Sequence, residues 1–128
     1  MGILQTAVEE ADDEDTPDRA RFYLASMLHV TGKHNRSAAE YRTLMKANGA
    51  AKFPSLGYRL GTALRAAGRL DEAAQAFEDA ATRGGDHKWT GLSWYRLARC
   101  RIDQGRYDEA RELLAELKKD PPAGVRGL

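Results

Sequence analysis

The sequence contains little cysteine and little proline, and it has no long apolar run. Cys100 is the only cysteine, which excludes an internal disulfide framework and a four-cysteine zinc site. No stretch approaches the roughly 20 apolar residues that cross a bilayer. Residues 1–15 have neither the basic flank nor the apolar core of a secretion signal. We therefore expect no membrane span and a cytoplasmic location.

Valine and isoleucine are also scarce, and no stretch alternates apolar and polar residues for long enough to indicate a strand. Without strands, a glycine-rich phosphate loop that follows a strand is excluded. The length of 128 residues suits one domain, and a chain of this size buries roughly two-thirds of its unfolded surface. The composition predicts an all-α domain with a core of its own.

Apolar residues recur at intervals of three and four, which is the spacing of one helix face. Thr16 is the expected N-cap of the first helix and Pro17 its first helical residue. Glycine and proline mark the other ends. The pattern predicts six helices, over 17–31, 35–47, 54–67, 70–83, a stretch capped by Asp86 or Thr90 that runs to 104, and 107–119.

The predicted helices form pairs, and the pairs repeat. Residues 68–73 (GRLDEA) and 105–110 (GRYDEA) match closely at a separation of 37, and a weaker copy lies at 32–37. Each motif alone is weak because its residues are common. Three copies in register are a strong signal of a repeat architecture.

On these residues the chain resembles the tetratricopeptide repeat family, whose signature of tryptophan, leucine–glycine, tyrosine, alanine, phenylalanine and proline spans about 34 residues. The third repeat supplies Trp94, Leu97, Ala98, Gly105, Ala110, Leu114 and Pro122. The middle repeat supplies Leu60, Gly61, Leu64, Gly68, Ala73, Phe77 and Ala80, with Gly57 in the tryptophan place. The first supplies Leu24, Ala25, Leu28, Gly32, Tyr41 and Leu44, with Arg21 and Ser37 as departures.

The resemblance implies antiparallel helix pairs stacked into a right-handed α-solenoid over residues 17–122, with repeats at about 17–50, 54–86 and 89–122. Residues 1–16 are then a partial helix and acidic leader, and 123–128 a tail. Small residues should let paired helices approach closely, namely Ala25, Gly61, Ala98, Ala73 and Ala110. Large ones should fill the gap to the next pair, namely Tyr41, Phe77 and Leu114. The residues beyond 34 per repeat are expected in loops 49–53 and 84–89.

Both ends of the expected array have uncovered apolar faces. Residues 3–11 look like the second helix of a preceding pair without its partner, and nothing after Pro122 resembles a polar capping helix. Two interpretations follow. The chain is a piece of a longer array or of a larger protein, or its ends are covered by self-association into a homo-oligomer.

The near-neutral net charge of +1 conceals a polarised chain. Residues 1–16 hold six acidic residues and no basic one, whereas 17–128 hold 20 basic and 13 acidic residues. Of the 20 basic residues 14 are arginine, which favours bidentate contacts with carboxylate or phosphate. One hypothesis is that the acidic leader folds back and competes for the expected binding groove of the array.

The resemblance also implies a concave groove lined by the first helix of each pair. The residues expected to face it are Phe22, Ser26, His29, Tyr58, Thr62, Arg65, Tyr95 and Arg99. Aromatic rings beside arginine suit an extended peptide with acidic side chains; alternatively, some rings only pack between repeats. The lysine- and asparagine-based carboxylate clamp of some family members is not matched, since only Arg99 has a comparable place.

No catalytic, cofactor or metal site is expected. His29, His34 and His87 lie in three segments without ligand spacing. Cys100 lies within a helix with no visible base, so it should pack as a small apolar residue. Trp89 either covers the long loop or belongs to a binding surface.

The leading hypothesis is a non-catalytic scaffold or adaptor that binds a protein or peptide in its groove. The second is a scaffolding segment of a larger enzyme, because residues 21–25 (RFYLA) with Gly32 and Tyr41 resemble repeat segments attached to some bacterial glycosyltransferases. RNA binding is a third reading that the basic body permits. It is disfavoured because Ser26, Thr62 and Arg99 form no evident base-reading code.

Overall fold

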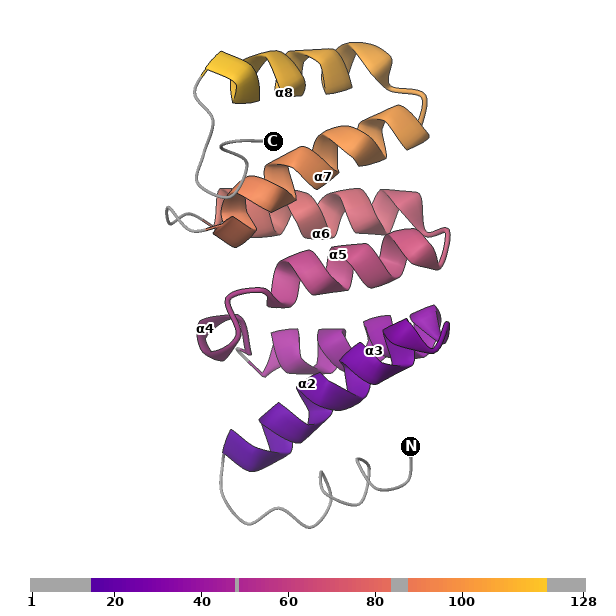
Figure 1. Ribbon diagram of the computed structural model, residues 1–128, viewed down its shortest axis with the longest axis vertical. Coiled ribbons are helices and arrows are strands. Elements are labelled where there is room, and N and C mark those ends of the chain that lie inside the picture. Colours follow the sequence, from indigo (N-terminus) through magenta and orange to yellow (C-terminus); the bar gives the residue numbers. More distant parts are fainter. Residues whose placement is uncertain (1–14, 48, 84–87, 120–128) are drawn as a thin grey trace.

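The computed structural model describes residues 15–47, 49–83 and 88–119, which form helices joined by short turns. The helices are α2 (Asp15–Val30), α3 (His34–Lys46), α4 (Gly49–Lys52), α5 (Leu56–Ala66), α6 (Leu70–Thr82), α7 (Lys88–Asp103) and α8 (Tyr107–Lys119). They follow one another in chain order along the long axis of the molecule (Figure 1). Strands are absent from the described ranges. The prediction of an all-α solenoid of helix pairs is confirmed.

The six predicted helices are present, but some boundaries differ. Because α2 begins at Asp15, Thr16 lies inside the helix and the prediction that it is the N-cap is wrong. Thr90 likewise lies inside α7, which begins at Lys88, while the alternative cap Asp86 falls outside the described residues. The predicted loop at 49–53 contains the one-turn helix α4, closed by a bond from the Phe53 N–H to the Gly49 carbonyl.

The same turn joins the two helices of all three pairs. Gly32, Gly68 and Gly105 have φ of 86°, 80° and 77°, a left-handed conformation that glycine adopts without a Cβ penalty. The N–H of the residue after the glycine donates to the carbonyl five residues earlier, as in the bond of 2.9 Å from Arg69 to the Leu64 carbonyl. The Gly68 N–H donates to the Arg65 carbonyl at 3.0 Å. This pair of bonds is the Schellman C-cap, and it explains why glycine recurs at the repeat spacing.

Small residues bring the paired helices together, as the sequence predicts. Ala25, Gly61, Ala73, Ala98 and Ala110 are all buried. A Cβ added at Gly61 would lie 2.7 Å from the ring of Phe77. The middle pair therefore depends on the absence of a side chain at this position.

Ser37, a departure from the family pattern, occupies in the first pair the place that Ala73 has in the middle pair. Its side chain is fully buried, and its hydroxyl donates to the Ala25 carbonyl at 2.7 Å. A buried hydroxyl is costly unless it is hydrogen-bonded. The bond to α2 satisfies it and links the two helices.

Tyr41 and Phe77 are buried within the core as predicted. Leu114, which was expected to play the same part, is 38% exposed, so that prediction is wrong. No described helix follows α8 and covers it. Leu113, one residue earlier, packs partly against the core instead.

Apolar side chains are exposed on the first helix of the described array as well. Tyr23, Met27 and Val30 lie at intervals of four and three on α2, and Val30 is 83% exposed. The apolar segment at 3–11 that was expected to precede α2 lies outside the described residues. The interpretations of the uncovered ends therefore stay open.

Candidate functional site

Three first helices, α2, α5 and α7, meet on one face of the molecule. The guanidinium of Arg59 on α5 lies 5.3 Å from the ring centre of Phe22 on α2 and 5.7 Å from that of Trp89 on α7. All eight predicted groove residues belong to these three helices. We give the name first-helix face to these eight residues together with Arg59, Trp89 and Arg96; the contacts of Arg59 and the pocket described next join members from all three helices.

A pocket of about 190 Å³ lies in the first-helix face. It is lined by His29, Thr62, Arg65, Ala66, Phe77 and Arg96. Three of these residues, His29, Thr62 and Arg65, were predicted from the sequence to face the groove. The pocket therefore combines a half-buried imidazole and two guanidinium groups with an apolar wall.

Two of the three predicted groove aromatics are packed between helices. Phe22 is half-buried and stacks on Phe53, with ring centres 4.6 Å apart and planes at 14°. Tyr58 is also half-buried, and its ring centre lies 5.4 Å from that of Trp89 and 5.9 Å from that of Phe77. Tyr95 is 40% exposed. Packing against rings of neighbouring segments is therefore part of the role of Phe22 and Tyr58, as the alternative interpretation expected.

The hydroxyl groups of this face take part in internal hydrogen bonds. Ser26 bonds to the Tyr41 hydroxyl at 2.9 Å, and Thr62 donates to the Tyr58 carbonyl at 2.9 Å. The Tyr58 hydroxyl accepts from Arg96 Nε at 3.3 Å. These bonds fix the side chains, so the face is largely organised in advance.

The arginines of the face differ in how their charge is balanced. Arg65 pairs with Asp103 at 2.8 Å. Arg59 donates to the neutral hydroxyl of Ser55, and Arg96 to that of Tyr58. Within the described ranges no carboxylate forms an ion pair with Arg59, Arg96 or Arg99. The face therefore carries positive charge that the described residues leave uncompensated.

His29 and His34 are brought together across the turn between α2 and α3, which the sequence spacing did not predict. Their Nδ1 atoms are 3.0 Å apart. Burial lowers the pKa of His29, and the neighbouring His34 and Arg59 lower it further. His87 lies outside the described residues. In the part of the chain that the structure describes, no group of three or more His, Cys, Asp or Glu side chains is placed to hold a metal ion.

Cys100 is fully buried in α7, and this burial raises the pKa of its thiol. A raised pKa keeps the sulfur protonated at neutral pH, and the thiolate is the nucleophilic form. Cys100 therefore packs as a small apolar residue, as the sequence indicated.

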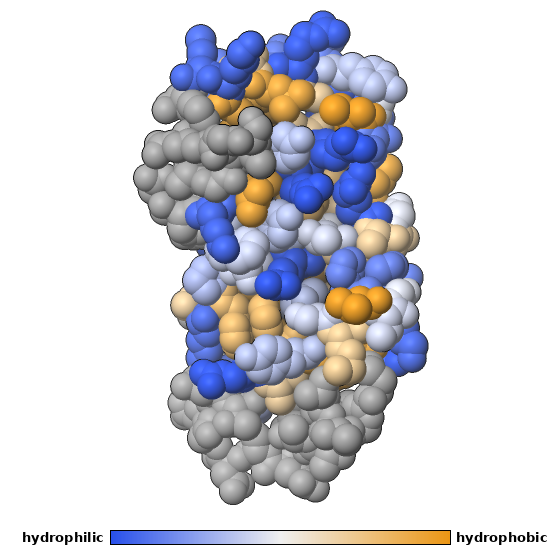
Figure 2. Space-filling view, in the orientation of Figure 1, coloured by the Kyte–Doolittle hydropathy of each residue, from blue (hydrophilic) through white to orange (hydrophobic). Residues whose placement is uncertain are grey.

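Sequence reasoning missed Arg59, Arg96 and Phe53 as members or supports of this face. A signal for the two arginines was available, because they follow Tyr58 and Tyr95 directly and are separated by 37 residues, the repeat spacing. Phe53 follows the unpredicted helix α4, and its stacking on Phe22 depends on how that helix places it. Trp89, whose role the sequence left open, contacts Arg59 and Tyr58 on α5. Figure 2 shows one side of the molecule, where hydrophilic residues interrupt the hydrophobic patches along the whole described length.

Comparison with known families agrees with this architecture. Two family models, both described as tetratricopeptide repeat, match residues 30–88 and 64–124. The chain belongs to the tetratricopeptide repeat family. Repeats of this family are generally protein–protein interaction modules and typically non-catalytic scaffolds.

No curated protein and no solved structure matches the chain. None of the described helices is long and apolar enough to pass through a membrane.

Proposed function

We propose that the first-helix face binds an extended segment of a partner protein that carries acidic side chains. The observation that supports this most directly is the uncompensated charge of Arg59, Arg96 and Arg99 on a face already lined with aromatic rings. Hydrogen bonds between arginine and a carboxylate are among the stronger ones in proteins. Aromatic and arginine side chains are also the commonest binding hot spots.

The pocket of about 190 Å³ offers a place for one side chain of that segment. Arg65 and Arg96 line it, and Phe77 provides its apolar wall. A carboxylate placed there would meet Arg96, which no described carboxylate neutralises. Tyr95 and Arg99, both exposed on α7, would contact the residues that follow.

Pre-existing order on this face favours binding without a large conformational change. Arg59 is held over two rings, and Arg96 is held by Tyr58. Side chains that are fixed before binding lose less conformational entropy on binding. Affinity should therefore depend on the charges themselves more than on new ordering of the chain.

Selection from a phage-displayed library of random peptides tests this proposal. We expect the full chain to enrich peptides with Asp or Glu beside an aromatic residue. The double variant Arg96→Gln/Arg99→Gln should lose this enrichment. The matched control is Arg36→Gln/Arg111→Gln, which removes the same charge from exposed positions on α3 and α8.

The proposal is wrong if no acidic peptides are enriched. It is also wrong if the same acidic peptides are enriched by the Arg96→Gln/Arg99→Gln variant as by the unmodified chain. Circular dichroism of each variant before selection shows whether the helices are intact. A variant that fails to fold is replaced by the single substitution Arg99→Gln, whose side chain is exposed.

A further inference from the structure

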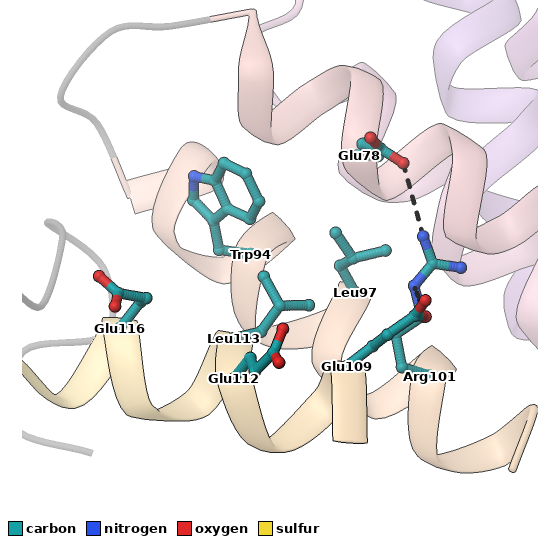
Figure 3. Close-up of a pocket in the computed structure, with 8 residues that line it drawn as sticks. All are labelled: Glu78, Trp94, Leu97, Arg101, Glu109, Glu112, Leu113 and Glu116. Carbon is teal, nitrogen blue, oxygen red and sulfur yellow. Dashed lines mark ion pairs between the residues drawn. The ribbon is translucent and has the colours of Figure 1, made fainter. Parts of the chain in front are cut away.

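A second, larger pocket of about 350 Å³ lies among α6, α7 and α8, in a part of the molecule that the sequence analysis did not single out. Its apolar part consists of Trp94, Leu97 and Leu113. Leu97 is buried, and Trp94 and Leu113 are half-buried. Figure 3 shows these three side chains gathered between the helices. An apolar floor that water can reach favours burial of an apolar group.

The rim of this pocket is acidic. Glu78, Glu109, Glu112 and Glu116 surround the apolar floor (Figure 3). Among the described residues that line the pocket, Arg101 is the only basic one, and it already pairs at 3.6 Å with both Glu78 and Glu109. We call the whole site the acidic pocket.

Two of the rim carboxylates are weakly neutralised. Glu116 has Lys119 at 4.0 Å as its ion-pair partner, and both side chains are largely exposed. Within 15–47, 49–83 and 88–119, Glu112 has no ion-pair partner. Glu109, by contrast, pairs at 2.5 Å with Arg106, which lowers its pKa. The rim therefore carries excess negative charge at neutral pH, concentrated on α8.

The acidic pocket differs from the corresponding place in the middle pair at the position of Trp94. The equivalent position in the middle pair, 37 residues earlier, is Gly57, where an added Cβ would lie 2.8 Å from the Cβ of Ala80. At that junction the helices close directly on one another. In the third pair an indole occupies the corresponding place and leaves an apolar floor that accepts a further group.

We propose that the acidic pocket binds a partner protein segment in which an apolar side chain is flanked by lysine or arginine. Its apolar residue would rest on Trp94, Leu97 and Leu113. Its cations would meet Glu112 and Glu116. The volume is near the lower end of the range of about 300–1,000 Å³ that small-molecule sites occupy, which suits one or two side chains.

Charge complementarity separates this partner from that of the first-helix face. The first-helix face has uncompensated arginine and selects acidic segments, whereas the acidic pocket repels them. The two pockets share α6 and α7 but no lining residue, since Phe77 and Arg96 line one and Glu78, Trp94, Leu97 and Arg101 line the other. Failure of one site in an experiment therefore leaves the other site independently testable.

The test is a second selection from the phage-displayed random peptide library with the full chain as bait. We expect enrichment of peptides in which Leu, Phe or Met lies between basic residues. The variant Glu112→Gln/Glu116→Gln should lose them and keep the acidic class. Its matched control, Asp79→Asn/Asp108→Asn, removes the same charge from exposed positions on α6 and α8 and should keep both classes.

Affinity measurements with one enriched basic peptide, labelled with fluorescein and followed by anisotropy, make the result quantitative. We expect Glu112→Gln/Glu116→Gln to weaken binding by about tenfold, which corresponds to about 1.4 kcal/mol, and the control to change it by about twofold or less. The Arg96→Gln/Arg99→Gln variant should bind this peptide as tightly as the unmodified chain.

Three results would overturn the proposal. The first is the absence of basic-apolar peptides from the selected pool, and the second is equal binding by the Glu112→Gln/Glu116→Gln variant and the unmodified chain. The third is a concentration-dependent dimer, seen by sedimentation, that the Glu112→Gln/Glu116→Gln variant abolishes. That last result would assign the acidic pocket to a second copy of the chain.

Discussion

Close packing in the middle pair depends on one missing side chain. The ring of Phe77 fills the space that a Cβ at Gly61 would need, since the separation would be only 2.7 Å. Phe77 is fully buried, so its ring cannot turn away into solvent. The family pattern of a small residue facing a large one thus has a direct steric cause here.

We expect the substitution Gly61→Ala to destabilise the chain. Overpacking of a full core lowers the free energy of unfolding by about 1–3 kcal/mol. The higher helix propensity of alanine offsets about 1 kcal/mol of this loss. The net result should be a lower midpoint of thermal unfolding, measured by circular dichroism. In a Phe77→Leu background the same substitution should cost less, and an equal or greater cost there would contradict the steric explanation.

His29 gives the chain a pH dependence whose sign follows from its lowered pKa. The unfolded chain binds a proton near pH 6.5, and the folded chain binds it only at lower pH. Stability is therefore fully present above about pH 6.5 and decreases as the pH falls towards the folded pKa.

We expect His29→Gln to flatten this decrease. Thermal unfolding of both chains between about pH 5 and 8 measures the effect, because other titrating groups are common to the two proteins. If the midpoint of the variant falls with pH as steeply as that of the unmodified chain, His29 is not the responsible group.

The two helices of each pair are joined by a turn whose geometry is set by backbone conformation. Gly68 has a φ of 80°, and no atom lies within 4 Å of the position its Cβ would take. A side chain at Gly68 would therefore meet no steric clash and only the intrinsic cost of a left-handed residue. The turn at Gly68 thus differs from the helix contact at Gly61, where an added Cβ would clash with the ring of Phe77.

We predict that Gly68→Ala lowers the free energy of unfolding by about 1–2 kcal/mol, the cost of a left-handed conformation for an L-residue with a Cβ. Asparagine tolerates this conformation better, so Gly68→Asn should cost less. Urea unfolding of the three chains measures the difference. Equal stabilities of the alanine and asparagine variants would show that the turn does not require left-handed geometry.

Helix periodicity and the repeated glycine predicted the six main helices, because both are local properties of the chain. Helix α4 was missed because four residues are too short to show a period. Leu114 was assigned to the core by its register, but the register does not tell whether a further helix covers it.

The site was predictable only in part for a similar reason. The repeat register placed His29, Thr62 and Arg65 on one face, and the pocket there contains all three. The position of Arg59 over rings of two other helices depends on tertiary packing. The acidic pocket depends on α6, α7 and α8 together, and no local pattern marks it.

At the scale of the whole molecule, a net charge of +1 results from surfaces of opposite sign. The first-helix face is basic, and the acidic pocket is negative. The segment before α2 adds further acidic residues, whose placement lies outside the described ranges. Under the two proposals above, a chain that is near-neutral on average would bind two partners of opposite charge.

If the acidic leader competes for the first-helix face, neutralising it should tighten the binding of acidic peptides. We expect the quadruple variant Glu9→Gln/Glu10→Gln/Asp12→Asn/Asp13→Asn to raise the affinity at low salt, with a smaller difference at high salt because salt screens exposed charges. Substitution is preferable to truncation at residue 16, because α2 begins at Asp15. Unchanged affinity at low salt would exclude competition by these carboxylates.

The most direct test of the proposed binding face is the dissociation constant of one acidic library peptide, followed by fluorescence anisotropy. It is measured for the unmodified chain, for Arg96→Gln/Arg99→Gln and for the control Arg36→Gln/Arg111→Gln. We predict a loss of about tenfold for the first variant, equivalent to about 1.4 kcal/mol, and about twofold or less for the control. Equal weakening in both variants would mean that only net charge matters and would contradict a defined binding face on α2, α5 and α7.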